Sequence, residues 1–475
     1  MESTVKNILA DRYASESMKS IWSEPGKIKI ERTLWIAILK AQKSLGLDIP
    51  LEVIDSYEGQ LSKIDLDSIR KRELVTKHDV KARIDEFCAL AGHEHIHKGM
   101  TSRDLTENVE QLQVHQSIKL ILQKSVACLS KLGKLANEHK NLVITGRSHN
   151  VPAQPTTLGK KIAMYGEEFA HAIEAFAVFL ERFPVRGLKG AVGTQTDQLT
   201  LFSGDANKVA QLDAKVGEHL GIRAKWDAVG QVYPRSLDFE LVSSIYQLTA
   251  APSNFARMVR LMAGHETASE GFAKGQTGSS AMPHKMNSRS CERVHGFRTI
   301  LSGHVTMASN LAGDQWHEGD VSCSVVRRVL LPDACFAIDG LLNTWMNILD
   351  QMVLYPAMIE SELEQFAPFL MTTTLMMEAV KKGMGRETAH HAIKKHAVEE
   401  IRDRRENAAT ENRLVKRLGE DDNFPLNQDE LKEIVGRIHQ QTGNAEQQIA
   451  SFVKRVASLE QRFPEAANLK TEKIL

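Results

Sequence analysis

The chain has 475 residues, enough for about three domains and a large buried core. Its 60 lysine and arginine residues equal its 60 aspartate and glutamate residues, so no net charge draws it to nucleic acid or to an anionic membrane. The five cysteines are odd in number and lack metal-binding spacing, which predicts reduced thiols. No apolar run is long enough to span a bilayer, and the amino terminus lacks the apolar core of a signal peptide. We therefore expect a soluble, cytoplasmic protein with no membrane partner.

Residues 1 to about 110 predict short helices joined by loops. The segment Lys77-His78-Asp79-Val80 begins one of them, and its His–Asp pair is either a tuned acid–base pair or part of a capped helix start. Thr101 with Asp104 three residues later matches a capping box. The amides of such a helix start are equally able to hold a carboxylate.

Apolar residues then recur at intervals of three and four, which predicts five long helices. The expected ranges are about 102–140, 157–182, 237–268 kinked at Pro252, 289–312, and 321–350 bent at Pro332. Strand-like alternation is hard to find. Long helices with apolar stripes bury them against one another, so we predict an all-α fold with a helical bundle.

We predict three domains from these patterns. The expected boundaries are 1–110 for an N-terminal helical domain, 111–360 for the long-helix bundle, and 361–475 for a C-terminal helical domain. Long helices of this kind often pack between subunits, which favours a homo-oligomer.

Three segments between helices carry the chemistry. Residues 145–157 form a polar turn with two prolines, and His149 within it cannot belong to the core of either neighbouring helix. Residues 187–195 are glycine-rich and are weak evidence alone. In residues 271–293 the glycines allow unusual backbone conformations, successive amides can form an anion-binding nest, and Lys285 adds a positive charge. A solvated linker is the alternative, but an apolar Ala281-Met282-Pro283 centre disfavours it.

Residues 278–287, GSSAMPHKMN, resemble the signature loop of the fumarase/aspartase superfamily, whose members expel fumarate from a succinyl-bearing substrate. The segments around His149 and at 187–195 resemble the superfamily's other two characteristic regions. Ser288 departs from the usual proline and affects only the stiffness of the loop's exit. The resemblance implies a fumarase/aspartase-like fold and a homotetramer whose active sites are shared between subunits. It implies no cofactor, and no metal is expected because spacing such as H-E-x-x-H is missing.

Within the superfamily, Arg12-Tyr13-Ala14-Ser15, Lys77–Val80 and residues 279–285 are most similar to the lyases that act on succinylated purine nucleotides. This resemblance implies release of fumarate from a succinyl purine nucleotide and from its imidazole-carboxamide counterpart. The alternatives are argininosuccinate lyase or another fumarate-releasing lyase, and a helical homologue without catalysis.

The resemblance assigns roles to individual residues. His149 is the expected general acid, and Ser279 is the expected base, with Ser280 as a second candidate. Lys285 and Asn287 are expected to stabilise a dianionic aci-carboxylate. His78 is the competing imidazole and is assigned to binding and to orienting the acid.

The remaining residues are expected to bind substrate. The residues that match positions for the succinyl carboxylates are Thr101, Ser102 and Gln195. The residues that match positions for the nucleotide are Arg12, Tyr13, Arg293, Ser324 and Arg328. Asp79 and Ser148 complete the binding set. One departure concerns the phosphate: many relatives read W-x-E-R where this chain has Trp316-His317-Glu318-Gly319. Arg327 or a lysine from elsewhere is expected to replace the missing arginine. The alternative for Arg327 and Arg328 is an exposed basic pair.

Overall fold

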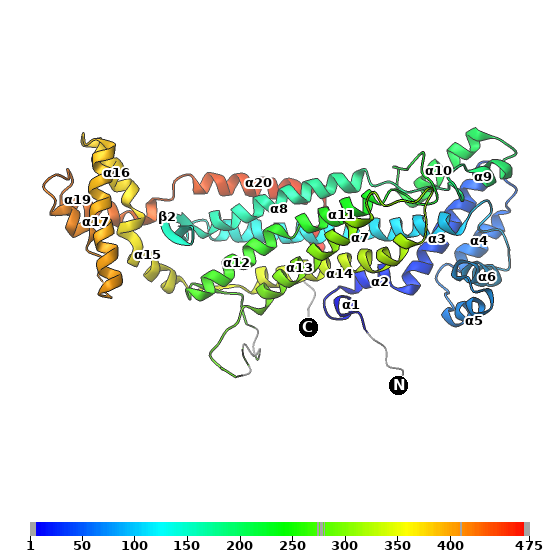
Figure 1. Ribbon diagram of the computed structural model, residues 1–475, viewed down its shortest axis with the longest axis horizontal. Coiled ribbons are helices and arrows are strands. Elements are labelled where there is room, and N and C mark those ends of the chain that lie inside the picture. Colours follow the sequence, from blue (N-terminus) through cyan, green and yellow to red (C-terminus); the bar gives the residue numbers. More distant parts are fainter. Residues whose placement is uncertain (1–5, 273–274, 276–278, 280, 409–410, 470–475) are drawn as a thin grey trace.

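The computed structural model describes residues 6–272, 275, 279, 281–408 and 411–469. The molecule is elongated, and the helices of its central bundle run along the long axis (Figure 1). These helices are α7 (Ser102–Glu138), α8 (Leu158–Glu181), α11 (Ser236–Gln247), α12 (Ala250–Gly264), α13 (Arg289–Leu311) and α14 (Ser322–Gln351). Their inward faces form the largest hydrophobic core, in which the rings of Phe169 and Phe255 contact Trp345 edge to face. The all-α prediction is confirmed.

The prediction of one continuous helix over about residues 237–268 was wrong. The segment forms two helices, α11 and α12, separated at Leu248 and Thr249. Pro252 lies in the first turn of α12, where a helix does not need the missing N–H, so this proline starts a helix and does not kink one. The other four predicted long helices are confirmed to within a few residues.

The N-terminal helices and part of the central chain form a second core at one end of the bundle. The helices of this core are α3 (Glu24–Ser44), α4 (Leu51–Gly59), α6 (Asp79–Ala91), α9 (Thr196–Leu201) and α10 (Ala206–Leu220). Helices α1 (Ile8–Arg12) and α2 (Glu16–Trp22) pack instead against the central core, and α5 (Leu66–Thr76) contributes Ile69 to a small separate cluster with Ile28 and Ala82. Helix α10 packs against α3.

A third core lies at the opposite end. Its elements are α15 (Pro356–Leu370), α16 (Thr372–Lys381), α17 (Arg386–Glu406), α18 (Leu414–Gly419), α19 (Gln428–Gly436) and η1 (Ile438–Gln440). Helix α20 (Ala445–Arg462) then returns along the central bundle and packs against α7 and α8, and η2 (Pro464–Asn468) follows it. The predicted domain boundaries remain a prediction.

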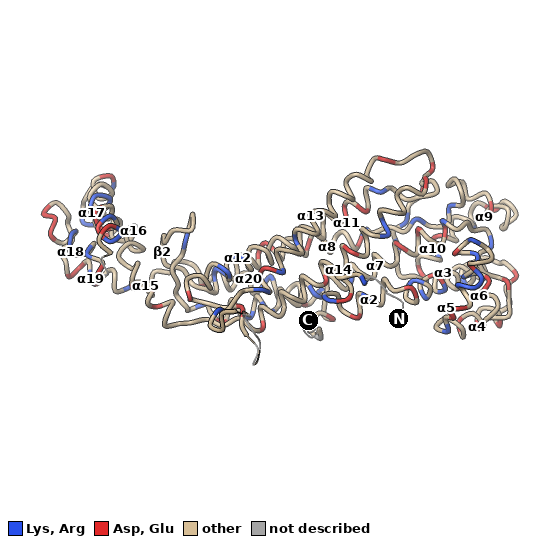
Figure 2. The backbone as a smooth tube through the Cα atoms, turned by 60° about the horizontal axis from the view of Figure 1, so that its bottom comes forward, with Lys and Arg blue, Asp and Glu red and all other residues tan. Residues whose placement is uncertain are grey.

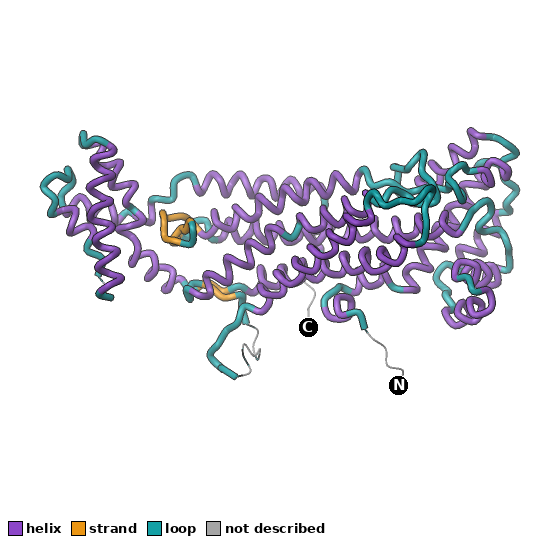
Figure 3. The backbone as a smooth tube through the Cα atoms, viewed as in Figure 1, coloured by secondary structure: helices purple, strands orange, loops and turns teal. Residues whose placement is uncertain are grey.

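The described residues also contain two small antiparallel sheets (Figure 3). Strand β1 (Val143–Ser148) pairs with β2 (Val151–Thr157), so the expected polar turn is a hairpin. The two-stranded sheet tolerates Pro152 and Pro155, because β2 pairs along only one side. Strands β3 (Ala268–Ser269) and β4 (Val353–Leu354) form the second sheet.

Basic and acidic residues are interspersed along the whole molecule (Figure 2), as the balanced composition predicts. Among the described helices, none has the length and apolarity that crossing a bilayer requires.

Candidate active site

The predicted site residues fall into separate groups along the bundle. His78, Thr101 and Gln195 lie near the amino-terminal end of α7, whereas His149 lies on the hairpin that follows its carboxyl-terminal end. Helix α7 has 37 residues and is about 55 Å long at 1.5 Å per residue. Figure 1 accordingly shows β2 and α6 at opposite ends of the central bundle. One chain therefore does not bring the two predicted histidines together.

His78 is the N-cap of α6. Its Nδ1 accepts the backbone N–H of Lys81 at 3.3 Å, so the neutral ring carries its proton on Nε2. The Asp79 carboxylate lies 3.7 Å from Nδ1 and pairs with Arg83 at 3.0 Å. Burial acts to raise the pKa of Asp79, but the Arg83 guanidinium, the Val80 amide and Lys27 together hold that pKa below its ordinary value. The capped-helix interpretation of His78 is thus correct, and the exposed imidazole still has a donor for a ligand.

Asp104 is a buried carboxylate that joins the first group. It accepts hydrogen bonds from the Thr101 amide at 2.8 Å and hydroxyl at 3.2 Å. It also accepts from Arg186 Nη1 at 2.6 Å and from the Lys189 amide at 2.8 Å. These contacts tie the glycine-rich segment to the start of α7. Gln195 ends that segment with a positive φ of 57°, and its side-chain amide donates to the Leu188 carbonyl at 2.8 Å.

Arg103 was not predicted from the sequence, although it directly follows Ser102. Its Nη1 donates to the Ser324 hydroxyl at 3.1 Å and to Glu107 at 3.2 Å. Its Nη2 donates to the Asp320 carbonyl at 3.3 Å. Arg103 therefore joins the first turns of α7 and α14 and reaches the segment that lacks the expected arginine.

The expectation that Arg327 replaces that arginine was wrong. Arg327 is 1% exposed, and its Nε donates to Asp238 at 2.8 Å. Its Nη1 pairs with Glu110 at 2.6 Å, and the Tyr233 hydroxyl is a further partner. These buried partners neutralise the guanidinium and leave it inaccessible to a nucleotide. Its neighbour Arg328 is exposed.

His149 lies at the tip of the β1–β2 hairpin. His149 and Asn150 have φ angles of 51° and 61°, which is the geometry of a type I′ turn. Ser148, His149 and Asn150 are all exposed. A non-glycine residue with positive φ is uncommon, although His and Asn are enriched there. The turn therefore leaves the imidazole exposed to solvent.

Part of the signature loop, including Ser280, lies outside the described residues. The Ser279 hydroxyl oxygen accepts from the amides of Met282 at 3.1 Å and Ala281 at 3.4 Å. Amide donors stabilise negative charge on such an oxygen, which is what a serine base requires. Lys285 is exposed and Asn287 is half-buried at the exit of the loop.

Glu270 anchors this loop and was also missed. It is 4% exposed, and its two oxygens accept from the amides of Ser290 and Cys291, each at 2.9 Å. A carboxylate at this position caps the amino-terminal turn of α13. The only sequence signal was an acidic residue immediately before Gly271.

Tyr13 and Arg293, both predicted to bind the nucleotide, contact each other. The Arg293 guanidinium lies 5.6 Å from the centre of the Tyr13 ring, which packs edge to face on Phe297. Arg12 is exposed at the end of α1. Helices α1 and α13, from whose region these residues come, lie between the two ends of the bundle (Figure 1).

The fold defines the class of protein. The chain resembles the crystal structures of a 3-carboxy-cis,cis-muconate lactonizing enzyme from Pseudomonas putida and of a fumarate lyase from Mesorhizobium sp. BNC1. The first structure matches with a TM-score of 0.80 and covers 96% of this chain and 100% of its own. The second matches with a TM-score of 0.78 and covers 93% of this chain and 98% of its own. Both are 18% identical to this chain. The chain therefore shares the fold of these two proteins.

Sequence comparison narrows the class. Residues 27–302 match the family model described as Lyase, and residues 368–452 match the model described as Adenylosuccinate lyase C-terminus. Adenylosuccinate lyase from Saccharomyces cerevisiae is 33% identical over 94% of this chain and 93% of its own. The enzyme of the same name from Schistosoma mansoni is 33% identical over 83% of each chain. The chain belongs to the adenylosuccinate lyase family and is a carbon–nitrogen lyase.

Proposed function

We propose that the protein eliminates fumarate from adenylosuccinate to give AMP, and from the succinylated aminoimidazole-carboxamide ribotide to give the free carboxamide. The observation that carries the proposal is the match to relatives named adenylosuccinate lyase over almost the whole chain, including the C-terminal model. The five cysteines are free thiols, which supports a reducing, cytoplasmic location.

The elimination needs a base for a weakly acidic proton next to a carboxylate, and an acid for the departing nitrogen. In our proposal Ser279 removes the proton, and the amides of Ala281 and Met282 stabilise its alkoxide. Lys285 and Asn287 stabilise the dianionic intermediate. His149 protonates the leaving nitrogen, while His78 binds substrate and orients the acid.

A complete site requires several subunits. The groups around His78 and His149 lie at opposite ends of α7, a helix about 55 Å long at 1.5 Å per residue. An antiparallel neighbour would bring the hairpin of one chain to the α6 end of another. This separation supports active sites shared between the subunits of a homotetramer. In these sites Thr101, Ser102 and Gln195 hold the succinyl carboxylates, and Ser148 and Asp79 complete the binding set.

Arg103 supplies the phosphate contact that is missing at Gly319. Gly319 has a φ of 130°, and a Cβ there would lie 2.8 Å from Cγ2 of Val232, so a side chain at that position is strained. Arg103 instead reaches the neighbouring Asp320 carbonyl and Ser324 from α7. Together with Arg328, and with Arg12, Tyr13 and Arg293 from a separate part of the assembly, it binds the nucleotide.

The test is incubation with adenylosuccinate in the presence of a chelator, without added cofactor, while ultraviolet absorbance and fumarate are followed. Release of equal amounts of fumarate and AMP is the expected result. Fumarate release from argininosuccinate alone would assign the substrate elsewhere in the superfamily. No release from either compound would favour a homologue without catalysis.

A further inference from the structure

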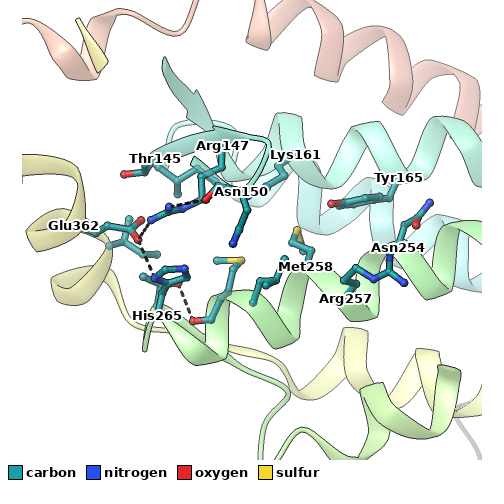
Figure 4. A pocket seen from close by; sticks show the side chains of 15 residues that line it. Thr145, Arg147, Asn150, Lys161, Tyr165, Asn254, Arg257, Met258, His265 and Glu362 are labelled. Atoms are coloured by element: carbon teal, nitrogen blue, oxygen red, sulfur yellow. Dashed lines mark hydrogen bonds and ion pairs between the residues drawn. The ribbon is translucent and has the colours of Figure 1, made fainter. Parts of the chain in front are cut away.

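A basic cavity lies below the β1–β2 hairpin, among β1, α8, α12 and the start of α15 (Figure 4). Its volume is about 280 Å³. Arg147 and Asn150 contribute to its lining, but Ser148 and His149, which lie between them, do not. The cavity therefore adjoins the turn, but His149 does not line it.

Basic groups outnumber acidic ones in this cavity. Glu362 is its one acidic lining residue, and it pairs with Arg147 at 2.6 Å and lies 3.7 Å from Nδ1 of His265. Within the described residues, neither Lys161 nor Arg257 forms an ion pair, although the Glu362 carboxylate acts on Lys161 from a longer distance. Burial, followed by the nearby Arg147 guanidinium, lowers the pKa of Lys161. An anionic ligand would relieve this crowding of positive charge.

Thr145 provides an independent sign of a ligand. The residue is 3% exposed and lines the cavity, yet its hydroxyl has no hydrogen-bond partner among the described residues. Leaving a buried hydroxyl unpaired costs about 1–3 kcal/mol. A ligand oxygen in the cavity would satisfy it.

The arrangement of the charges indicates the shape of the ligand. Arg147 and His265 lie at one end, Arg257 and Asn254 lie at the other, and Met258 lies between them (Figure 4). Further apolar lining comes from Ile144, Leu261, Met262 and Ile359. We propose that this cavity binds a small dicarboxylate, with one carboxylate near Arg147, Lys161 and Thr145, the other near Arg257, and the carbon chain over Met258. A cavity of this size lies at the small end of the usual range and is too small for a whole nucleotide.

Binding here also contacts the turn that presents His149. Arg147 Nη1 donates to the Asn150 carbonyl at 3.4 Å, and these two residues, on either side of Ser148 and His149, both line the cavity. The proposal does not depend on the elimination chemistry, because binding is measured without turnover.

The test is calorimetric titration of the full-length protein with succinate. Lys161→Met and Arg257→Met should each weaken binding at one site per chain by about tenfold or more, the effect of losing one charge-assisted hydrogen bond. Lys160→Met and Arg260→Met are the matched controls, because these neighbours on α8 and α12 do not line the cavity. Both controls should bind like the wild type.

Thermal melting of each variant checks the fold. Arg257 is exposed, so Arg257→Met remains informative even if Lys161→Met does not fold. Succinate binding that neither substitution weakens would overturn the proposal, as would a wild type that does not bind succinate. Inorganic phosphate binding with equal affinity and the same dependence on Lys161 would overturn the dicarboxylate assignment.

Discussion

The guanidinium of Arg103, in the first turn of α7, donates a hydrogen bond to the hydroxyl of Ser324, in the first turn of α14, across 3.1 Å. Two long helices thus begin side by side and are linked by a cation. Glu107 also pairs with Arg103. In addition, Arg235 Nη2 donates to both carboxylate oxygens of Glu107, at 2.9 and 2.8 Å. Removing Arg103 therefore does not leave Glu107 without a partner, which makes Arg103 suitable for substitution.

We predict that Arg103→Met raises KM for adenylosuccinate about tenfold or more, because a charge-assisted phosphate contact is lost. The kcat should change little, since Arg103 is not placed at the reacting atoms. Steady-state kinetics measures both. A nucleoside substrate without the phosphate should show no such KM difference between variant and wild type.

Arg70→Met is the matched control for Arg103→Met, because Arg70 is exposed on α5 and its nearest partner, Glu24, is 3.4 Å away at the surface. It should leave both constants unchanged. An equal KM increase with the phosphate-free substrate would show that Arg103 acts on the fold and not on the phosphate.

Gly319→Ala should lower the free energy of unfolding by about 1–3 kcal/mol, because φ of 130° is strained for any side chain and the added Cβ meets Val232. Urea titration measures the change. Gly313→Ala is the control: its φ is 88°, but no atom lies within 4 Å of the added Cβ, so the cost is smaller. Equal losses for the two variants would refute steric exclusion at 319.

Stability should fall as the pH decreases from about 6.5 towards 4. Burial lowers the pKa of His97 from 6.5 to about 4 in the folded protein, so the unfolded chain takes up the proton first and protonation favours unfolding. The stabilisation by this group is complete above the unfolded pKa and reaches at most about 3 kcal/mol.

His97→Asn should reduce that pH dependence, since Asn tolerates the φ of 66° and retains an acceptor for the Trp35 indole. Urea titrations at pH 7 and pH 4.5 measure it. His115, whose pKa burial also lowers to about 4, keeps part of the slope. His317→Asn is the control, because it replaces an exposed histidine of similar φ and should keep the full pH dependence of stability. An unchanged pH dependence in His97→Asn would contradict the prediction.

His149→Ala and Ser279→Ala should each lower kcat by about 10²-fold or more, because each removes a proton-transfer group. Mixing the two inactive variants should restore activity if the groups come from different chains. Activity of the mixed sample is compared with that of each variant alone, with subunit exchange verified by mass tags. Exchange without restored activity would contradict a shared site, and full loss from Ser280→Ala instead would move the base by one residue.

The sequence determined the helical class and four of the five predicted long helices, because an apolar stripe of period 3.6 must be buried whatever its partner. It also determined the signature loop and the capping box at Thr101, which depend on residues near one another in the chain. The split between α11 and α12 was missed because a proline in a first turn and a proline at a kink have the same local pattern.

Only the tertiary structure decided which charges are available to a ligand. Arg327 and Arg103 are both arginines on long helices. Arg327 is buried between Glu110 and Asp238, whereas Arg103 lies beside Ser324. Those partners are separated in sequence by between 89 and 221 positions, so no local pattern reveals them. The same holds for Glu270, which caps a helix 20 residues away, and for the separation of His78 from His149, which follows from the straight length of α7.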